Sequence, residues 1–423
     1  MTPRFRLLSL KTLVAVAAVA TAIAAPAETM RLGLIEGLSG PFANAGEAVE
    51  RNLLFAIERI NARGIRVGGT PLVLELVSLD SKGEVDGALQ SLQAAADRDI
   101  RVVLQGNSSG VAAGIIGAIE KHNQRNPGRE MLFLNYSAID PALTRDKCSF
   151  WHFRFDADLE MRLTALLGAL KDDRSVRRAY LINQNYSFGQ EFARLARERL
   201  AQLRPDIEIV GDDLIPIGKV KDFGPYAQKI RASDADVVLT GNWGNDLTLL
   251  VRAARESALD ARFLTFYANG LGAPAAIGNA GTGRALAVAE WHYNADTPGM
   301  RETYEAFTRR FPKPADDYFH ARMLLMMEML AQAAETAGSI EPKALALALE
   351  GMSIEQGGVA LQMRAADHQV QTDLYVSMME RVGSPGVDKD IEGSGFGFRT
   401  VARLPAAAVA TPPQCRMNRP AGR

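Results

Sequence analysis

Val102-Val-Leu-Gln-Gly-Asn107 and Val237-Val-Leu-Thr-Gly-Asn242 are nearly the same six residues, found once in each half of the chain. Each is a short apolar run that ends in a Gly-Asn turn, and a helical pattern follows each turn. Such a run, bounded by turn residues, is typical of a strand buried on both faces of a parallel sheet. The echo therefore indicates two similar α/β units in one chain.

The neighbouring segments extend the echo in both halves. Four strand-like runs, most of them followed by a turn and a helical pattern, occur in the same order in each half: 30–35, 72–79, 102–107 and 131–136, then 178–183, 207–215, 237–242 and 262–266. This alternation predicts an α/β fold of two doubly wound lobes with parallel sheets. Ligands of such lobes bind at the carboxyl ends of the strands, so the turns of the two lobes are expected to line one shared cleft.

Composition excludes several classes of protein. The 423 residues are 47% hydrophobic and 23% charged, with a formal net charge of −1. A nearly neutral chain of this kind is neither disordered nor equipped to bind nucleic acid. Two cysteines and five scattered histidines leave little material for a metal site. We therefore expect no metal and no cofactor.

The N-terminus has the pattern of an export signal. Arg4, Arg6 and Lys11 precede an apolar run at 13–24, and Ala25-Pro26-Ala27 is a small-x-small cleavage site. The run is too short to span a bilayer comfortably, so residues 1–27 are predicted to be a signal peptide cleaved near Ala27. The predicted compartment is the periplasm.

Export also bears on the two cysteines. Cys148 and Cys415 are the only cysteines in the chain. Disulfides form and persist in oxidising compartments. We therefore predict a disulfide between Cys148 and Cys415, which would tie the Pro-rich C-terminal tail to the middle of the chain.

Several motifs in fixed order carry a resemblance to a known family. They are Gly37-Leu-Ser-Gly-Pro-Phe42, Ile57-x-x-Ile60-Asn61-Ala-x-Gly64, Asn107-Ser108-Ser109, Pro141-Ala-Leu-Thr144, Tyr186-Ser-Phe-Gly189 and Ala366-Asp-His-Gln369. From about residue 30 to 380, the chain resembles the leucine/isoleucine/valine-binding family of periplasmic solute-binding proteins. Members of that family have the type I fold and deliver ligands to ABC importers.

The resemblance implies an organisation and a set of partners. Three crossovers, near residues 150, 290 and 352, would join the lobes. Lobe 1 would comprise 28–150 and 291–351, and lobe 2 would comprise 151–290 and 352–423, including the tail. The implied partners are one small molecule and the importer's permease and ATPase subunits, with contact to the membrane only through the permease. The expected protein is a monomer that performs no chemistry.

The candidate ligand contacts of lobe 1 are mostly hydroxyl groups. Ser108 and Ser109 lie at the start of a predicted helix, where backbone N–H groups and the helix dipole favour an anion. The resemblance implies that this turn, together with Ser137 and Ala138, holds the ligand's α-carboxylate. The alternative for Ser108 is a simple helix cap. Phe42 either closes the cleft or belongs to a core.

Aromatic residues dominate the candidate contacts of lobe 2. By resemblance, an aromatic ring near Phe188 contacts the ligand, and Tyr186 lies in the same turn. Trp243 follows the echoed strand, where a large ring is expected to have a partner. The alternative for these rings is packing within their own lobe. Tyr267 is a further candidate for stacking on a ligand ring.

The expected partner of a ligand ammonium is missing. The resembled family commonly supplies an acidic residue after the fourth strand of the second lobe, where this chain has Tyr267-Ala-Asn269-Gly270. Asp246 is the alternative carboxylate, although an acid in the first turn of a helix is also favoured by the dipole alone. The predicted ligand is a hydrophobic or aromatic amino acid or a related carboxylate.

Two other functions fit part of the sequence. Gly106-Asn-Ser-Ser-Gly110 matches the G-x-S-x-G elbow of serine hydrolases, which would make Ser108 the nucleophile of an esterase. The scattered histidines lack a triad signature, which argues against it. A periplasmic ligand sensor with the same fold is the other alternative, and it would have to act through a separate partner.

Overall fold

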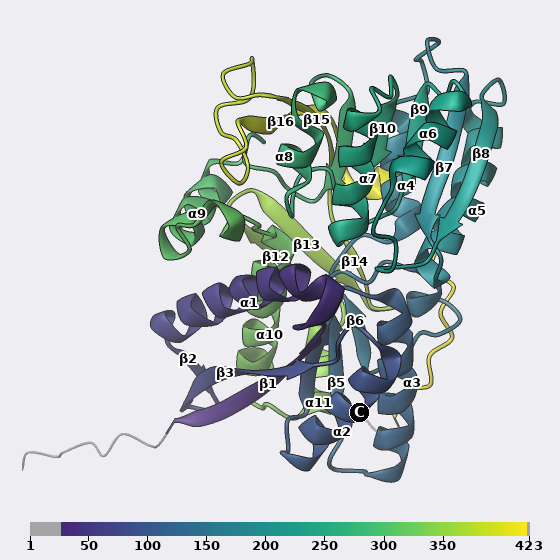
Figure 1. Ribbon diagram of the computed structural model, residues 1–423. Coiled ribbons are helices and arrows are strands. Elements are labelled where there is room, and N and C mark those ends of the chain that lie inside the picture. The colour runs from purple at the N-terminus through teal and green to yellow at the C-terminus, as the bar shows by residue number, and fades with distance from the viewer. Residues whose placement is uncertain (1–26, 421–423) are drawn as a thin grey trace, which may run out of the picture.

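The computed structural model describes residues 27–420, which form two lobes around two separate sheets (Figure 1). The first sheet contains β1 (Glu28–Glu36), β2 (Ile65–Val67), β3 (Thr70–Asp80), β4 (Val102–Gln105), β5 (Leu132–Asn135), β6 (His152–Arg154), β12 (Ser353–Gln356), β13 (Val359–Arg364) and β14 (Gln369–Gln371). The second sheet contains β7 (Arg178–Gln184), β8 (Glu208–Ile215), β9 (Val237–Thr240), β10 (Arg262–Thr265), β11 (Ala285–Ala289), β15 (Leu374–Arg381) and β16 (Phe396–Leu404).

The two sheets repeat the same parallel core. In the first sheet the order β5-β4-β1-β3 is parallel throughout, and in the second the order β10-β9-β7-β8 is likewise parallel. The echoed runs are β4 and β9, and each lies between the first and fourth strands of its own unit. Both are fully buried. The predicted fold of two doubly wound α/β lobes is confirmed.

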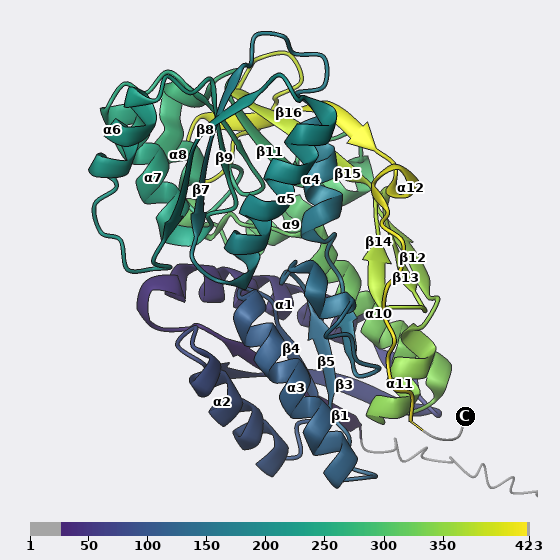
Figure 2. The ribbon, with the colours of Figure 1, turned by 90° about the vertical axis from the view of Figure 1, so that its right-hand side faces the viewer.

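Helices cover both faces of each sheet (Figures 1 and 2). In lobe 1, α2 (Val85–Asp97) lies beside α3 (Ser109–Arg125), and α1 (Ala43–Arg63) packs with α10 (Ala321–Ala337) and α11 (Pro342–Leu349) on the other face. In lobe 2, α4 (Leu159–Gly168) lies beside α5 (Ser187–Leu203), and α6 (Gly224–Ala232), α7 (Gly244–Glu256) and α8 (Ala273–Ile277) cover the opposite face. Helix α9 (Pro298–Arg310) packs on α1 through Phe307 and Phe55.

Short helices and one buried helix complete the architecture. The remaining elements are η1 (Gly40–Phe42), η2 (Pro141–Thr144), η3 (Gly278–Gly281), η4 (Pro314–Asp316) and α12 (Ala406–Val409). The apolar residues at 323–330 are buried within α10, in the core of lobe 1. An apolar helix of this kind must be covered on most sides, and α1 and α11 cover it here.

The chain crosses between the sheets at places that partly differ from the expected ones. The first two passages, after β6 and after β11, lie close to the expected positions near 150 and 290. The third lies between β14 and β15, at 372–373, and not near 352. Residues 353–371 join the first sheet because antiparallel pairs β12–β13 and β13–β14 extend it and β14 pairs with β6. Residues 353–371 therefore belong to the sheet of lobe 1, whereas we predicted that 352–423 belong to lobe 2.

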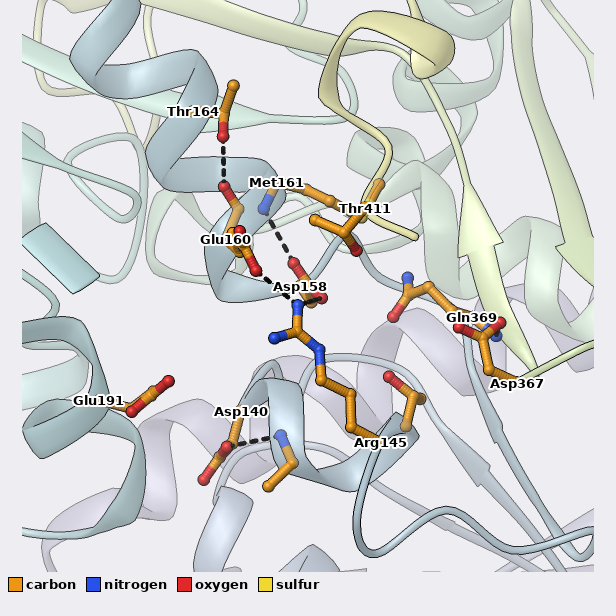
Figure 3. A network of polar contacts seen from close by, with 12 residues as sticks. Asp140, Arg145, Asp158, Glu160, Met161, Thr164, Glu191, Asp367, Gln369 and Thr411 are labelled. Carbon is orange, nitrogen blue, oxygen red and sulfur yellow. Dashed lines mark hydrogen bonds and ion pairs between the residues drawn. The ribbon is translucent and has the colours of Figure 1, made fainter. Parts of the chain in front are cut away.

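The region where the chain first passes between the lobes is rich in charge (Figure 3). Arg145, which follows η2, reaches across to Glu160 of α4 at 2.5 Å and lies 3.7 Å from Asp158. Asp158 also caps α4 by accepting a hydrogen bond from the backbone N–H of Met161. Buried Arg154 of β6 donates to Gln369 of β14 and to Thr144 of η2. The polar network thus ties the connecting segments to lobe 1 and to the start of α4.

The C-terminal segment joins both lobes. Residues 396–404 form β16 at the edge of the second sheet, and the following segment then returns to lobe 1 (Figure 2). There Cys415 is bonded to Cys148, as predicted, and Arg419 pairs with Glu350. Of the predicted signal peptide, residues 1–26 lie outside the described residues. Within residues 27–420, no helix has the length and apolarity needed to cross a membrane.

Candidate ligand-binding cleft

A cleft of about 630 Å3, part of it open to solvent, lies between the two lobes. Strand-end turns of both sheets and the start of α10 form its walls. Of the predicted contacts, those that line it are Ser109, Ser137, Ala138, Tyr186, Phe188, Trp243 and Tyr267. The turns identified from the echo therefore do meet at one cavity.

The turn at Gly106-Asn107 is stabilised by a side chain that we did not predict to be important, the carboxyl of Glu36. Oε1 of Glu36, the last residue of β1, accepts hydrogen bonds from the backbone N–H groups of Gly106 (2.9 Å) and Asn107 (2.8 Å). Burial raises the pKa of this carboxyl, although its hydrogen bonds act in the opposite direction. At Gly106 a Cβ would lie only 2.5 Å from the ring of Tyr136, so glycine is required there. These two amides are thus engaged by Glu36.

The two serines at the start of α3 have different surroundings. Oγ of Ser108 accepts the backbone N–H of Val111 as the helix cap, and the residue lines a smaller neighbouring cavity with Phe42 and Trp243. Ser109 lines the main cleft, and its Oγ accepts the backbone N–H of Asp140 at 3.3 Å. The cap alternative for Ser108 is therefore what the structure shows. An esterase would require a histidine hydrogen-bonded to Ser108. Among the described residues, no histidine pairs with it.

The second turn of lobe 1 is ordered by an asparagine and an arginine. Oδ1 of Asn135 accepts the backbone N–H groups of Ser137 (3.1 Å) and Ala138 (2.7 Å). Oγ of Ser137 accepts a hydrogen bond from Nη2 of Arg322 at 2.7 Å. Ser137 consequently offers its hydroxyl to the cleft, while the neighbouring amides are already bonded.

Lobe 2 contributes a wall of aromatic rings. Trp243 donates its indole N–H to the hydroxyl of Tyr186 at 2.9 Å, and Tyr186 lies against Phe188 with ring centroids 5.9 Å apart. Burial raises the pKa of Tyr186 well above its ordinary value and that of Tyr267 to about 12, so both hydroxyls stay protonated. These rings form an apolar surface that carries hydroxyl groups.

The lobes touch at the rim of the cleft. The rings of Phe42 in lobe 1 and Trp243 in lobe 2 lie 4.6 Å apart, and Nδ2 of Asn245 donates to the carbonyl of Pro41 at 3.1 Å. Phe42 lines the smaller neighbouring cavity rather than the main cleft. The described arrangement is therefore a closed one, with Phe42 at the contact between the lobes.

Two predicted contacts lie away from the cleft. The carboxylate of Asp246 accepts hydrogen bonds from Nε2 of Gln184 and the backbone N–H of Gly218, both at 2.8 Å, and burial raises its pKa. It holds a loop against the start of α7 and is not among the cleft residues. Asn269 is also outside the lining, although Gly270 next to it lines the cleft. Asp246 therefore does not supply the missing carboxylate.

The segment before α10 and the start of that helix contribute residues that the sequence reasoning missed: Tyr318, His320 and Arg322. Buried Arg322 bonds the carboxylate of Glu290 at 2.9 Å and lies 3.2 Å from that of Asp156. Burial raises the pKa of Glu290, but the guanidinium groups of Arg322 and Arg162 more than offset this and hold it below its ordinary value. The available signal was a cation at the start of an otherwise apolar helix, which needs a buried partner.

The sequence profile of the family described as periplasmic binding protein matches residues 29–384. This chain belongs to that family. The Leu/Ile/Val-binding protein homolog 4 of Brucella melitensis is 33% identical to this periplasmic binding protein over 414 residues, 95% of each chain. The matching curated relatives are named as binding proteins and not as enzymes.

Solved structures show the same fold. The closed conformation of a leucine-, isoleucine-, valine-, threonine- and alanine-binding protein from Brucella ovis is 28% identical. It matches with a TM-score of 0.80, covering 93% of this periplasmic binding protein and 100% of the other chain. An R. palustris solute-binding protein in complex with 4-hydroxybenzoate has the same fold at 15% identity, with a TM-score of 0.75 and coverage of 89% and 97%. Within residues 27–420, no group of His, Cys, Asp and Glu side chains is arranged to hold a metal ion.

Proposed function

We propose that this protein is the periplasmic solute-binding component of an ABC importer. Its ligand is a hydrophobic or aromatic amino acid or a related carboxylate, bound in the cleft between the lobes. The observation that carries the proposal is the wall of aromatic rings opposite the hydroxyl groups of Ser109 and Ser137 in one interlobe cavity. An apolar surface facing a few fixed polar groups is the usual composition of a small-molecule site.

The contact between the lobes supplies the signal to the importer. Phe42 meets Trp243 only when the lobes are together, so a ligand held between the lobes favours this closed form. The permease and its ATPase would distinguish the closed form from the open one. The names of the relatives support the choice of transported class, since one is called a Leu/Ile/Val-binding protein homolog and another a leucine-, isoleucine-, valine-, threonine- and alanine-binding protein.

Export and assembly follow from the same proposal. The signal peptide would be removed near Ala27, and the mature monomer would act in the periplasm. The disulfide between Cys148 and Cys415 is consistent with that compartment.

A thermal-shift screen tests the proposal. The mature protein, unfolded and refolded to remove any carried ligand, is tested with leucine, valine, phenylalanine, benzoate, phenylacetate and 2-oxo acids. A ligand at about 100 times its Kd adds about 2.7 kcal/mol to the free energy of unfolding, which raises the melting temperature by several degrees. A shift with at least one of these compounds is expected. The absence of any shift would refute the proposed ligand class.

A further inference from the structure

His320 is held in one tautomer by its neighbour. Nη1 of Arg322 lies 2.8 Å from Nδ1 of His320, and a guanidinium can only donate hydrogen bonds. Nδ1 must therefore be the acceptor, and the hydrogen of the neutral ring is on Nε2. Nε2 is buried and has no hydrogen-bond partner among the described residues, while the ring lines the cleft. The site thus contains a buried donor without an acceptor.

The surroundings keep this ring neutral. Burial lowers the pKa of His320 well below its ordinary value, and the positive charges of Arg322 and Arg162 act in the same direction. Oε1 of Glu290 lies 3.9 Å from Nδ1, but this carboxylate already pairs with Arg322. His320 is therefore available to donate one hydrogen bond.

Other polar groups of the cleft are oriented in the same way. Oγ of Ser137 accepts from Arg322, Oγ of Ser109 accepts from the backbone of Asp140, and the hydroxyl of Tyr186 accepts from Trp243. Because each oxygen accepts from the protein, each keeps its own hydrogen for a ligand. Nδ2 of Asn107 is also buried and without a partner among the described residues. The residues that carry these groups all line the cleft, so the cleft is rich in groups that can donate to a ligand.

No negative charge balances these donors. Among the described residues, the side chains that line the cleft include no carboxylate. Of the acids near the cleft, Asp156 and Glu290 are paired with Arg162 and Arg322. Glu36 already accepts hydrogen bonds from the backbone N–H groups of Gly106 and Asn107. An ammonium group needs acceptors and a counter-charge, and burying it without them is costly. A ligand with acceptor oxygens in its place would satisfy the donors.

We propose that His320 is a specificity-determining residue, which donates Nε2–H to an oxygen that the ligand carries where an amino acid carries its ammonium. The ligands selected are carboxylates with an apolar or aromatic group and an adjacent acceptor oxygen, of which 2-oxo acids are the simplest. This inference rests on the proposed function, since it concerns the ligand of the same cleft. Arg322 acts as a positioning residue that sets the direction of the hydrogen bonds of His320 and Ser137.

Matched ligand pairs test the choice of class. Isothermal titration of the refolded mature protein compares phenylpyruvate with phenylalanine, and 2-oxo-4-methylpentanoate with leucine. The 2-oxo acid of at least one pair is expected to bind at least tenfold more tightly than its amino acid. Tighter binding of the amino acids would overturn the inference and leave the transport proposal standing. Failure of all four to bind would also overturn it, while a shift with benzoate in the thermal screen would still uphold the transport proposal.

A variant separates a donor role from a structural one. 3-Phenylpropanoate has the ring and carboxylate of phenylpyruvate but lacks the oxo oxygen. His320→Phe is expected to weaken phenylpyruvate about tenfold and to leave 3-phenylpropanoate within threefold, whereas His320→Gln, which retains an N–H donor, should recover part of the loss. An equal loss for both ligands would overturn the donor role.

A second measurement does not depend on the folding of a variant. Nitrogen-15 NMR of the histidine-labelled wild-type protein reports which ring nitrogen bears the hydrogen. A neutral ring with the hydrogen on Nε2 is expected for His320. A hydrogen on Nδ1, or on both nitrogens at neutral pH, would overturn the proposal.

Discussion

Phe42→Ala is expected to weaken ligand binding without changing ligand preference. The side chain belongs to lobe 1, and its ring contacts Trp243 of lobe 2 at a centroid separation of 4.6 Å. It also covers Gly218 so closely that a Cβ there would lie 2.9 Å from Cζ of Phe42. Since Phe42 does not line the main cleft, its removal should act on lobe closure.

The magnitude follows from the two contacts. Half-burial of a phenylalanine ring contributes about 1 kcal/mol, and an aromatic pair adds about 1 kcal/mol. The closed form would therefore lose about 2 kcal/mol, which corresponds to an approximately 30-fold rise in Kd. The full loss appears in Kd when the unliganded protein is open, because closure then accompanies binding.

Isothermal titration with the compounds that shift the melting temperature measures this effect. Phe311→Ala is a matched control, since Phe311 is a half-buried ring that packs on Phe307 within lobe 1, with centroids 5.1 Å apart. The control should lose stability and keep its Kd. An unchanged Kd in Phe42→Ala, or losses that differ more than threefold between ligands, would refute the role in closure.

Three further predictions concern the cleft wall, the disulfide and acid stability. Trp243→Ala removes a ring that lines the cleft and the partner of Phe42, so it should weaken binding by more than about 1 kcal/mol in the same titrations; an unchanged Kd would remove Trp243 from the site. Replacing Cys148 and Cys415 with Ser opens a bond that spans 267 residues, and by chain entropy it should cost roughly 3–5 kcal/mol in urea unfolding, with ligand preference unchanged; two free thiols in native, unreduced protein would contradict the bond. Burial, aided by the charge of Arg301, lowers the pKa of His292 to about 4. In the unfolded chain the pKa of His292 is about 6.5. The stability that comes from keeping His292 neutral is therefore fully present above pH ~6.5. As the pH falls towards 4, the free energy of unfolding drops by at most about 3 kcal/mol from this residue. His292→Phe should flatten the decline between pH 7 and 5, and equal declines in both proteins would exclude this residue.

Much of the site was predictable because it lies on repeated local patterns. Strand-end turns can be recognised from a short apolar run and the glycine or asparagine that follows, and parallel strands bring such turns to one edge. Ser109, Ser137 and Trp243 were found in this way, and all three line the cleft. Asp246 was misplaced because charge and position in a helix do not say which way a carboxylate points.

The residues that were missed come from outside the repeat. His320 and Arg322 lie at the start of α10, far along the chain from the turns that they join, and only the packing of α10 against the first sheet brings them there. The same reason explains the third crossover, because strands β12 to β14 extend the first sheet by pairings that no local pattern specifies.

The amino-acid sequence was enough to predict the α/β class, the two-lobed repeat, the pairing of the only two cysteines and the kind of residue that lines the cleft. These follow from periodicity, turn chemistry and counting, which are local or global properties of the chain. Only the folded protein shows which side chains line the cavity, and that Arg322 orients His320 and Ser137 as donors. Hydrogen-bond direction depends on the atoms that approach within about 3 Å. Arg322 and Ser137 are 185 residues apart and meet only after folding. Arg322 and His320 are close in sequence, but closeness in sequence does not say which way their side chains point.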